Sequence, residues 1–135
     1  MRIYTSYFAN GKALKSAGIC MVGIALYPPR WFGGRSIRSV APTRSILKDT
    51  RTDEEYTRRY ESEILPNVDF TRFVGELERI SGGSDVALCC YERPSEFCHR
   101  QLLAKAMNAI GYNVEEWKPV EDRDAERQMS LDFSE

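Results

Sequence analysis

Four short runs of apolar residues along the chain have the length and composition of buried strands. They cover residues 2–8, 19–26, 85–91 and 112–117 and are rich in aromatic, aliphatic and β-branched side chains. The runs at 19–26 and 85–91 are almost wholly apolar, which is typical of strands covered on both faces. We therefore expect a sheet whose central strands are buried from both sides.

Between these runs the apolar positions take the period of an amphipathic helix. Phe70, Phe73 and Leu77 follow the i, i+3, i+7 spacing that places side chains on one face of a helix. Asp69 can cap the start of this helix, and Gly82 can end it. Further helices are predicted over residues 11–17, 53–65 and 96–110.

Strands that alternate with helices favour a parallel sheet with crossover connections. We predict an α/β fold, a small three-layer domain with a mostly parallel sheet of about four strands, over residues 1–117. Residues 118–135 are predicted to be a charged C-terminal tail. No apolar run has the length of a membrane span, and the N-terminus lacks the pattern of a signal peptide. We therefore expect a cytoplasmic protein without membrane contact.

The net charge of −1 conceals an uneven distribution of charged residues. Residues 1–51 hold nine Lys and Arg against one acid, whereas residues 52–135 hold ten against nineteen acids. Most of the basic residues of the first part lie in the irregular segment 30–51, which follows a double proline and contains a double glycine. Such a basic loop favours a phosphate-bearing partner, although the two parts of the chain can also neutralise each other in the fold.

The residues best suited to chemistry lie between the strand at 85–91 and the following helix. Glu92, Cys98 and His99 are the candidate catalytic residues there. Free backbone N–H groups and the helix dipole favour an anion at such a junction, and together with Arg100 they lower the pKa of a thiol. His99 is the single histidine of the chain and can exchange protons near neutral pH. The alternative is an ordinary helix surface without a function.

The chain contains four cysteines, too few for a disulfide-rich scaffold in a domain of this length. We expect them to be free thiols, metal ligands or catalytic groups. At least one of Cys89 and Cys90 is expected to be a small buried hydrophobic residue. Cys90, Cys98 and His99 are weak candidates for a metal site, because adjacent residues such as Cys98 and His99 point in different directions on a helix. We therefore predict no metal, and the residues indicate no particular cofactor.

The segment from Leu88 to Ala104 reads Leu-Cys-Cys-Tyr-Glu, then a proline-containing turn, then Cys-His-Arg at the start of a helix. It resembles the signature of the family called domain of unknown function 488. The order of the other elements up to residue 117 is also similar to that family. Members commonly carry a Val-Asp-Val-Arg-like sequence after the second strand, where this chain has Arg30 but no acid. The resemblance implies the predicted fold and a pocket at the signature.

We expect this pocket to face the basic loop and to accept a nucleotide or the end of a nucleic acid. Arginine side chains suit bidentate phosphate contacts, and aromatic rings can stack on a base. Three functions stay open: an enzyme acting on a nucleotide or nucleic acid, a non-catalytic nucleic-acid-binding module that uses residues 30–51, and a metal-binding or thiol-binding protein. The sequence alone does not decide whether the protein is an enzyme. The phosphate-binding candidates are Arg30, Arg35, Arg38 and Arg100, and the stacking candidates are Tyr27 and Trp31.

The tail contains Gln128, Leu131 and Phe133 at a spacing that resembles the peptide by which bacterial DNA-processing proteins bind the DNA polymerase sliding clamp. The polar residues before it suit a solvated tether, and its apolar groups can fill pockets on a partner. The clamp is therefore a candidate partner, which would place the protein near DNA. The alternative is that the tail packs on its own domain.

Overall fold

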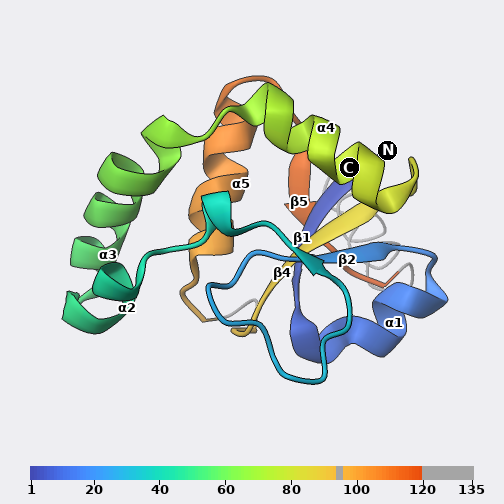
Figure 1. Ribbon diagram of the computed structural model, residues 1–135, viewed down its shortest axis with the longest axis horizontal. Helices are drawn as coiled ribbons and strands as arrows, with labels where there is room; N and C mark the ends of the chain where they lie inside the picture. Colours follow the sequence, from blue (N-terminus) through green and yellow to red (C-terminus); the bar gives the residue numbers. More distant parts are fainter. Residues whose placement is uncertain (94–95, 120–135) are drawn as a thin grey trace, which may run out of the picture.

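The computed structural model describes residues 1–93 and 96–119. Within these residues five parallel strands form one sheet in the order β3-β2-β4-β1-β5 (Figure 1). The strands are β1 (Ile3–Tyr7), β2 (Cys20–Gly23), β3 (Arg35–Ser36), β4 (Val86–Cys90) and β5 (Val114–Glu116). The α-helices are α1 (Gly11–Ser16), α2 (Arg44–Asp49), α3 (Asp53–Arg59), α4 (Phe70–Ser81) and α5 (His99–Ala109). Short 3₁₀ turns occupy Phe8–Asn10, Arg38–Val40 and Leu65–Asn67, and a π turn occupies Tyr60–Ile64.

The predicted α/β class is confirmed, and the described sheet is wholly parallel with five strands instead of four. The additional strand is β3, whose residues Arg35 and Ser36 pair with Val22 and Gly23 of β2. Arg35 is exposed and Ser36 is only partly buried, so no apolar alternation marks this strand in the sequence. The segment 30–51 is accordingly not one continuous loop, since it contains β3, a 3₁₀ turn and α2.

Side chains of β4 alternate between two apolar layers, one on each face of the sheet. Val86, Leu88 and Cys90 belong to the core cluster under α4 and α5. Ala87 and Cys89 belong to the cluster on the opposite face, where α1 packs. Figure 1 shows α4 and α5 on one side of the sheet and α1 on the other. This is the three-layer arrangement that the buried strand patterns predict.

The ends of α4 are set by the residues that the sequence predicts. The Asp69 carboxylate accepts a hydrogen bond from the Arg72 N–H at 3.1 Å, which caps the start of the helix. Gly82 takes the left-handed conformation with φ of 65°, which ends the helix. Phe73 and Leu77 are buried in the core, as their helical spacing predicts.

The helix predicted over residues 53–65 changes its winding after Arg59. Here α3 gives way to the π turn, and Pro66 lies in the 3₁₀ turn that follows. Tyr60 stands at the change: its hydroxyl donates a hydrogen bond to the Val40 carbonyl at 2.6 Å. The buried Tyr60 ring belongs to a small cluster that joins α2 and α3 to α5. The hydrogen bond of its hydroxyl and the packing of its ring both fix Tyr60 in place. These contacts can stabilise a change in helix winding that the sequence pattern does not predict.

The C-terminal candidates Gln128, Leu131 and Phe133 lie outside the described residues, so the clamp peptide and its fold-back alternative stay predictions. Among the described residues, no helix is both long enough and apolar enough to cross a lipid bilayer.

Replacing Tyr60 by Phe removes the hydroxyl and leaves the buried Val40 carbonyl without its donor. We expect the free energy of unfolding to fall by about 1–3 kcal/mol, the usual cost of an unsatisfied buried polar group. Urea unfolding followed by circular dichroism measures the change. Tyr112→Phe is the matched control, because Tyr112 is half-buried and its hydroxyl makes no hydrogen bond within the described residues. An equal loss in both variants would contradict the role given to the Tyr60 hydrogen bond.

Candidate functional site

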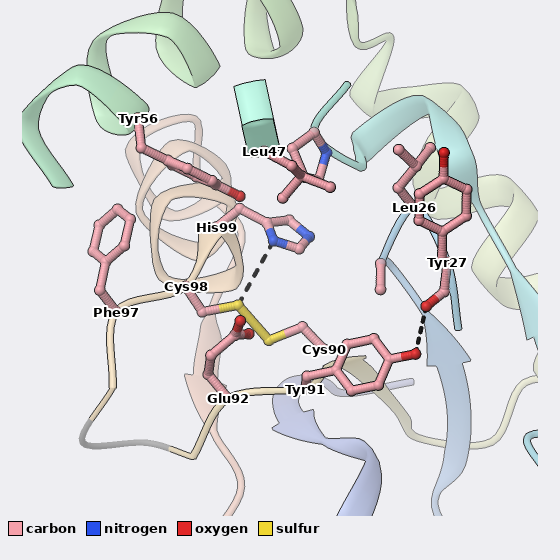
Figure 2. Close-up of a pocket in the computed structure, with 12 residues that line it drawn as sticks. Leu26, Tyr27, Leu47, Tyr56, Cys90, Tyr91, Glu92, Phe97, Cys98 and His99 are labelled. Carbon is pink, nitrogen blue, oxygen red and sulfur yellow. Dashed lines mark hydrogen bonds between the residues drawn. A yellow bond between two sulfur atoms is a disulfide. The ribbon is translucent and has the colours of Figure 1, made fainter. Parts of the chain in front are cut away.

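Between the neighbouring strands β2 and β4 the sheet has a point where the two chain connections run toward opposite edges. From β2 the chain continues to β3 at one edge, whereas from β4 it continues through α5 to β5 at the other edge. The carboxyl ends of such strands leave a crevice, where open parallel sheets bind ligands. A cavity of about 320 Å³ lies at this point (Figure 2). It is lined by Ala25, Leu26, Tyr27, Pro42, Leu47, Tyr56, Cys90, Tyr91, Glu92, Phe97, Cys98 and His99.

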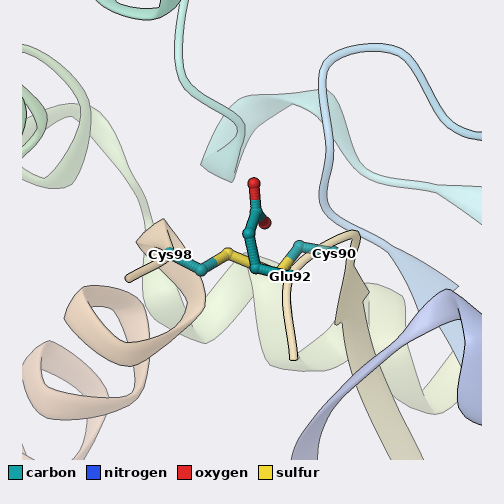
Figure 3. Close-up of side chains that lie close together, drawn as sticks. All are labelled: Cys90, Glu92 and Cys98. Carbon is teal, nitrogen blue, oxygen red and sulfur yellow. A yellow bond between two sulfur atoms is a disulfide. The ribbon is translucent and has the colours of Figure 1, made fainter. Parts of the chain in front are cut away.

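Two cysteines of the signature meet at this cavity. Cys90 is the last residue of β4 and Cys98 is the N-cap of α5, and their sulfur atoms are joined in a disulfide (Figures 2 and 3). The expectation of free thiols is therefore wrong for this pair. The end of the strand and the start of the helix lie against each other, although the two residues are eight positions apart in the sequence.

Cys89 is the buried hydrophobic cysteine that the strand pattern predicts. Its side chain is fully buried on the α1 face, and this burial raises the pKa of the thiol to about 12. Such a thiol stays protonated and inert at neutral pH. Since neighbouring residues of a strand point to opposite faces, the chemistry at this strand end falls to Cys90.

His99 is buried in the first turn of α5, with 4% of its surface exposed. One ring nitrogen, Nε2, lies 2.7 Å from the Ile24 carbonyl oxygen, and the other, Nδ1, lies 3.6 Å from the Cys98 sulfur. Because a carbonyl oxygen only accepts, Nε2 carries the proton and Nδ1 is an unprotonated acceptor. Burial lowers the pKa of His99 to about 4; the hydrogen bond to Ile24 opposes this shift, and the charge of Arg100 adds to it. At neutral pH the imidazole is therefore uncharged.

Arg100 lies in the core and does not line the cavity, although its side chain is predicted to bind phosphate. Its Nε and Nη2 donate to the Glu116 carboxylate at 3.0 and 3.3 Å. Its Nη1 donates to the Cys90 sulfur at 2.7 Å and to the Glu92 carbonyl oxygen. Sequence reasoning missed Glu116, but the strand period carries a signal for it. Val114 faces the core under α5, and a residue two positions later shares its face.

Glu92 is half-buried and projects beside the two sulfur atoms (Figure 3). A carboxylate oxygen of Glu92 and the sulfurs of Cys90 and Cys98 all lie within 4.8 Å of one another. With the disulfide reduced, two thiolates and a carboxylate form a ligand set that suits zinc or another thiophilic metal. Of the three weak candidates named from the sequence, this set keeps Cys90 and Cys98 and has Glu92 in place of His99.

The predicted phosphate-binding arginines do not gather at the cavity. Arg35 and Arg38 line a different cavity beside α4. Arg30 is exposed in the loop after β2, and Arg100 is buried with its own partners. The positive charge that the sequence assigns to one pocket is thus divided among several places in the fold.

The predicted stacking residues also lie apart. Tyr27 lines the cavity, whereas Trp31 lines a separate groove beside α1. Three further aromatic residues of the cavity were missed. Tyr91 and Phe97 lie inside the signature, so their position between its reactive residues was a usable signal. Tyr56 comes from α3, and nothing near it in the sequence indicates that α3 reaches this cavity.

The single histidine of the chain permits a direct test of the site, because its nuclear magnetic resonance signals need no assignment. We expect the His99 imidazole of the folded protein to titrate with a midpoint near 4, and that of the urea-unfolded chain near 6.5. Since folding lowers this pKa, the contribution of His99 to stability is complete above about pH 6.5 and is lost as the pH falls toward 4.

The matched variant is His99→Gln, whose amide can still donate to Ile24 but does not titrate. Its stability should change less with pH than that of the unmodified protein between pH 6.5 and 4. A folded-state midpoint near 6.5 would contradict the buried, uncharged imidazole.

A model of the family described as the active DUF488-N3 subclade matches residues 11–111, from the start of α1 to just beyond the end of α5. This range contains both strand ends of the cavity and the whole of the signature. No curated protein and no solved structure matches the chain. Because the family model covers more than half of the chain, the protein belongs to the domain of unknown function 488 family.

Proposed function

We propose that the protein is an enzyme that acts on a nucleotide or a nucleic acid, with the cavity between the ends of β2 and β4 as its active site. One observation carries the proposal. Glu92, Cys98 and His99, singled out by their chemistry in the sequence, line the same cavity where two strand connections diverge. An acid, a thiol and an imidazole that converge in a crevice are the usual components of an active site. The description of the subclade as active agrees with an enzyme.

The walls of the cavity suit a flat and largely apolar ligand. Tyr27 and Tyr91 are 59% and 51% exposed, and the Tyr91 hydroxyl donates to the Tyr27 carbonyl oxygen. Tyr56 and Phe97 meet edge to face, with ring centres 5.2 Å apart. Figure 2 shows these two pairs on opposite sides of the reactive side chains. Rings arranged in this way favour a nucleobase, which stacks on aromatic faces with little dependence on its sequence.

The reactive groups provide a nucleophile, a base and an acid. With the disulfide reduced, the Cys98 thiol can give its proton to Nδ1 of His99, which lies 3.6 Å away. The thiolate then attacks the electrophilic centre of the substrate, and the bond to the leaving group breaks as Glu92 protonates that group. Water subsequently releases the product from the sulfur, and its proton restores Glu92. The Cys98 sulfur leaves as a thiolate and takes its proton back from His99, which completes the cycle.

Replacing Glu92 by Gln should lower the turnover of the preferred substrate at least about a hundredfold, the usual contribution of a general acid, while its Kd changes little. The preferred substrate is sought among nucleosides, nucleotides and short DNA or RNA strands, incubated with the reduced protein. Chromatography of the products measures turnover, and titration calorimetry measures binding. Tyr91→Ala should instead weaken binding about tenfold through the loss of stacking.

Glu96→Gln is the matched control for the acid, because Glu96 lies on the same loop, is exposed and does not line the cavity. Its turnover should equal that of the unmodified protein. Absence of both binding and turnover across the whole panel, or equal losses in the Glu92 and Glu96 variants, would overturn the proposal.

A second groove favours the other candidate function, binding of nucleic acid without catalysis. It measures about 710 Å³ and is lined by Lys12 and Lys15 of α1 and by Trp31 and Phe32 of the loop after β2. Trp31 is 66% exposed and meets the edge of the Phe8 ring, with centres 6.4 Å apart. An exposed indole next to two ammonium groups suits a base and its neighbouring phosphates.

Lys15→Gln should weaken the binding of a single-stranded oligonucleotide and reduce the slope of log Kd against log salt by about one half to one. Trp31→Ala should weaken binding about tenfold without changing that slope, because stacking releases no counterions. Fluorescence anisotropy at several salt concentrations measures both effects. Lys105→Gln on α5 is the matched control, since it removes the same charge from the opposite face of the sheet. If the two lysine variants showed equal slopes of log Kd against log salt, the groove would be excluded as the binding site for nucleic acid.

A further inference from the structure

We propose that Cys90 and Cys98 are a reversible dithiol–disulfide pair that opens and closes the candidate active site. The pair lies at the site of the proposed function. Its effect on turnover rests on that proposed function, because turnover is what the pair would switch on and off. The exchange of thiol and disulfide is measurable without any substrate, so the two proposals can fail separately.

The fold holds both cysteines in place without the bond between them. Cys90 is paired with Tyr7 in the parallel ladder of β4 and β1. The backbone N–H of Cys98 donates to Oε1 of Gln101 at 2.9 Å, which fixes the start of α5. Both side chains belong to the main core cluster. Breaking the sulfur–sulfur bond therefore requires no unfolding of the strand or the helix.

Arg100 favours the opening of the bond. Its Nη1 lies 2.7 Å from the Cys90 sulfur, and a guanidinium at this distance stabilises the thiolate that leaves during reduction. A stabilised thiolate shifts a dithiol–disulfide equilibrium toward the reduced form. Glu116 balances the charge of Arg100 from the other side, so the strength of this effect depends on both residues.

When the bond opens, the second sulfur, that of Cys98, can donate a hydrogen bond to His99. Its unprotonated Nδ1 lies beside Cys98, so a Cys98 thiol finds an acceptor in the buried site. An external dithiol supplies the two electrons and is itself oxidised to a disulfide. Of its two protons, one goes to the Cys98 sulfur and the other to solvent, while Cys90 remains a thiolate.

The opening changes what the cavity can do. As a disulfide, Cys98 has no thiol for His99 to deprotonate and cannot attack a substrate. As a thiol it can, and it faces the same cavity as Glu92. Both cysteines are buried yet line the cavity, so the cavity is the route by which a small thiol would reach them. Cys89 does not compete, because it lies in the apolar layer on the other face.

The test uses the full chain with the two free cysteines replaced, Cys20→Ser and Cys89→Ala, so that only the pair can react. The protein is equilibrated in buffers of reduced and oxidised dithiothreitol, alkylated, and weighed by mass spectrometry. We expect two alkyl groups in reducing buffer, none in oxidising buffer, and full return in both directions. Glutamyl endopeptidase, which cuts after Glu92 and Glu96, then releases linked peptides from the oxidised form only. Circular dichroism should show the same fold in both forms.

Two variants separate a specific electrostatic effect from general damage to the fold. Arg100→Lys loses the N–H to sulfur contact and should shift the equilibrium about tenfold toward the disulfide. Glu116→Gln keeps that contact, frees the charge of Arg100, and should shift the equilibrium toward the dithiol. General loosening of the core would move both variants in the same direction, which would overturn the role of Arg100.

The proposal also specifies how turnover follows the state of the pair. Reduced protein should turn over the substrate found in the panel, oxidised protein should not, and reduction should restore turnover. A pair that never closes, or that does not reopen in the folded protein, overturns the proposal. So does a pair that holds one zinc ion per chain and resists oxidation when zinc is added, or turnover that is equal in both forms. If the pair exchanges reversibly but the protein turns over no substrate, the proposal of a reversible pair is supported and the proposed enzyme function is overturned.

Discussion

A buried guanidinium that donates hydrogen bonds to β5, to the end of β4 and to the loop after β4 holds the candidate site together. Arg100 comes from α5, Glu116 from β5, and the Cys90 sulfur and Glu92 carbonyl oxygen from the end of β4. A cation in the core is costly unless all of its donors are matched, and removing one partner commonly destabilises a fold by about 3–5 kcal/mol. The start of α5 is therefore fixed relative to two strands by a single side chain, and Cys98 and His99 are fixed with it.

The same helix start also reaches the other strand of the crevice. His99 donates to the carbonyl oxygen of Ile24, directly after β2, while Arg100 next to it reaches β4. Consecutive side chains on a helix point about 100° apart, which is what allows neighbours to contact two different strands. The same rule does not hold for Cys98 and His99, because Cys98 is the extended N-cap and not yet helical. The Cys98 sulfur and Nδ1 of His99 lie 3.6 Å apart, so the expectation that these two side chains point in different directions is wrong.

The local parts of this structure are readable from the sequence, whereas the partners across the fold are not. The period of Phe73 and Leu77, the Asp69 cap and the apolar runs predict α4, its ends and the covered sheet. The position of Glu92, Cys98 and His99 between strand and helix places them at one cavity. Nothing local pairs Arg100 with Glu116, joins Cys90 to Cys98, or marks a strand as short and polar as β3. Those features depend on which elements become neighbours, and a basic residue in a sequence does not reveal whether its charge is already neutralised.

The neutralised arginine constrains how a phosphate-bearing substrate would sit in the proposed active site. The cavity offers aromatic rings, two sulfurs and one carboxylate, and the exposed Arg30 does not line it. A phosphate inside such an apolar space would lose its hydration without gaining a cation, which is unfavourable. The base and sugar of a nucleotide therefore suit the cavity, and its phosphate belongs in solvent, where exposed basic residues attract it at a distance. For the proposed enzyme this arrangement favours a reacting bond near the sugar or base and not at the phosphate, because Cys98 and Glu92 line the cavity and would act on the part of the substrate that enters it.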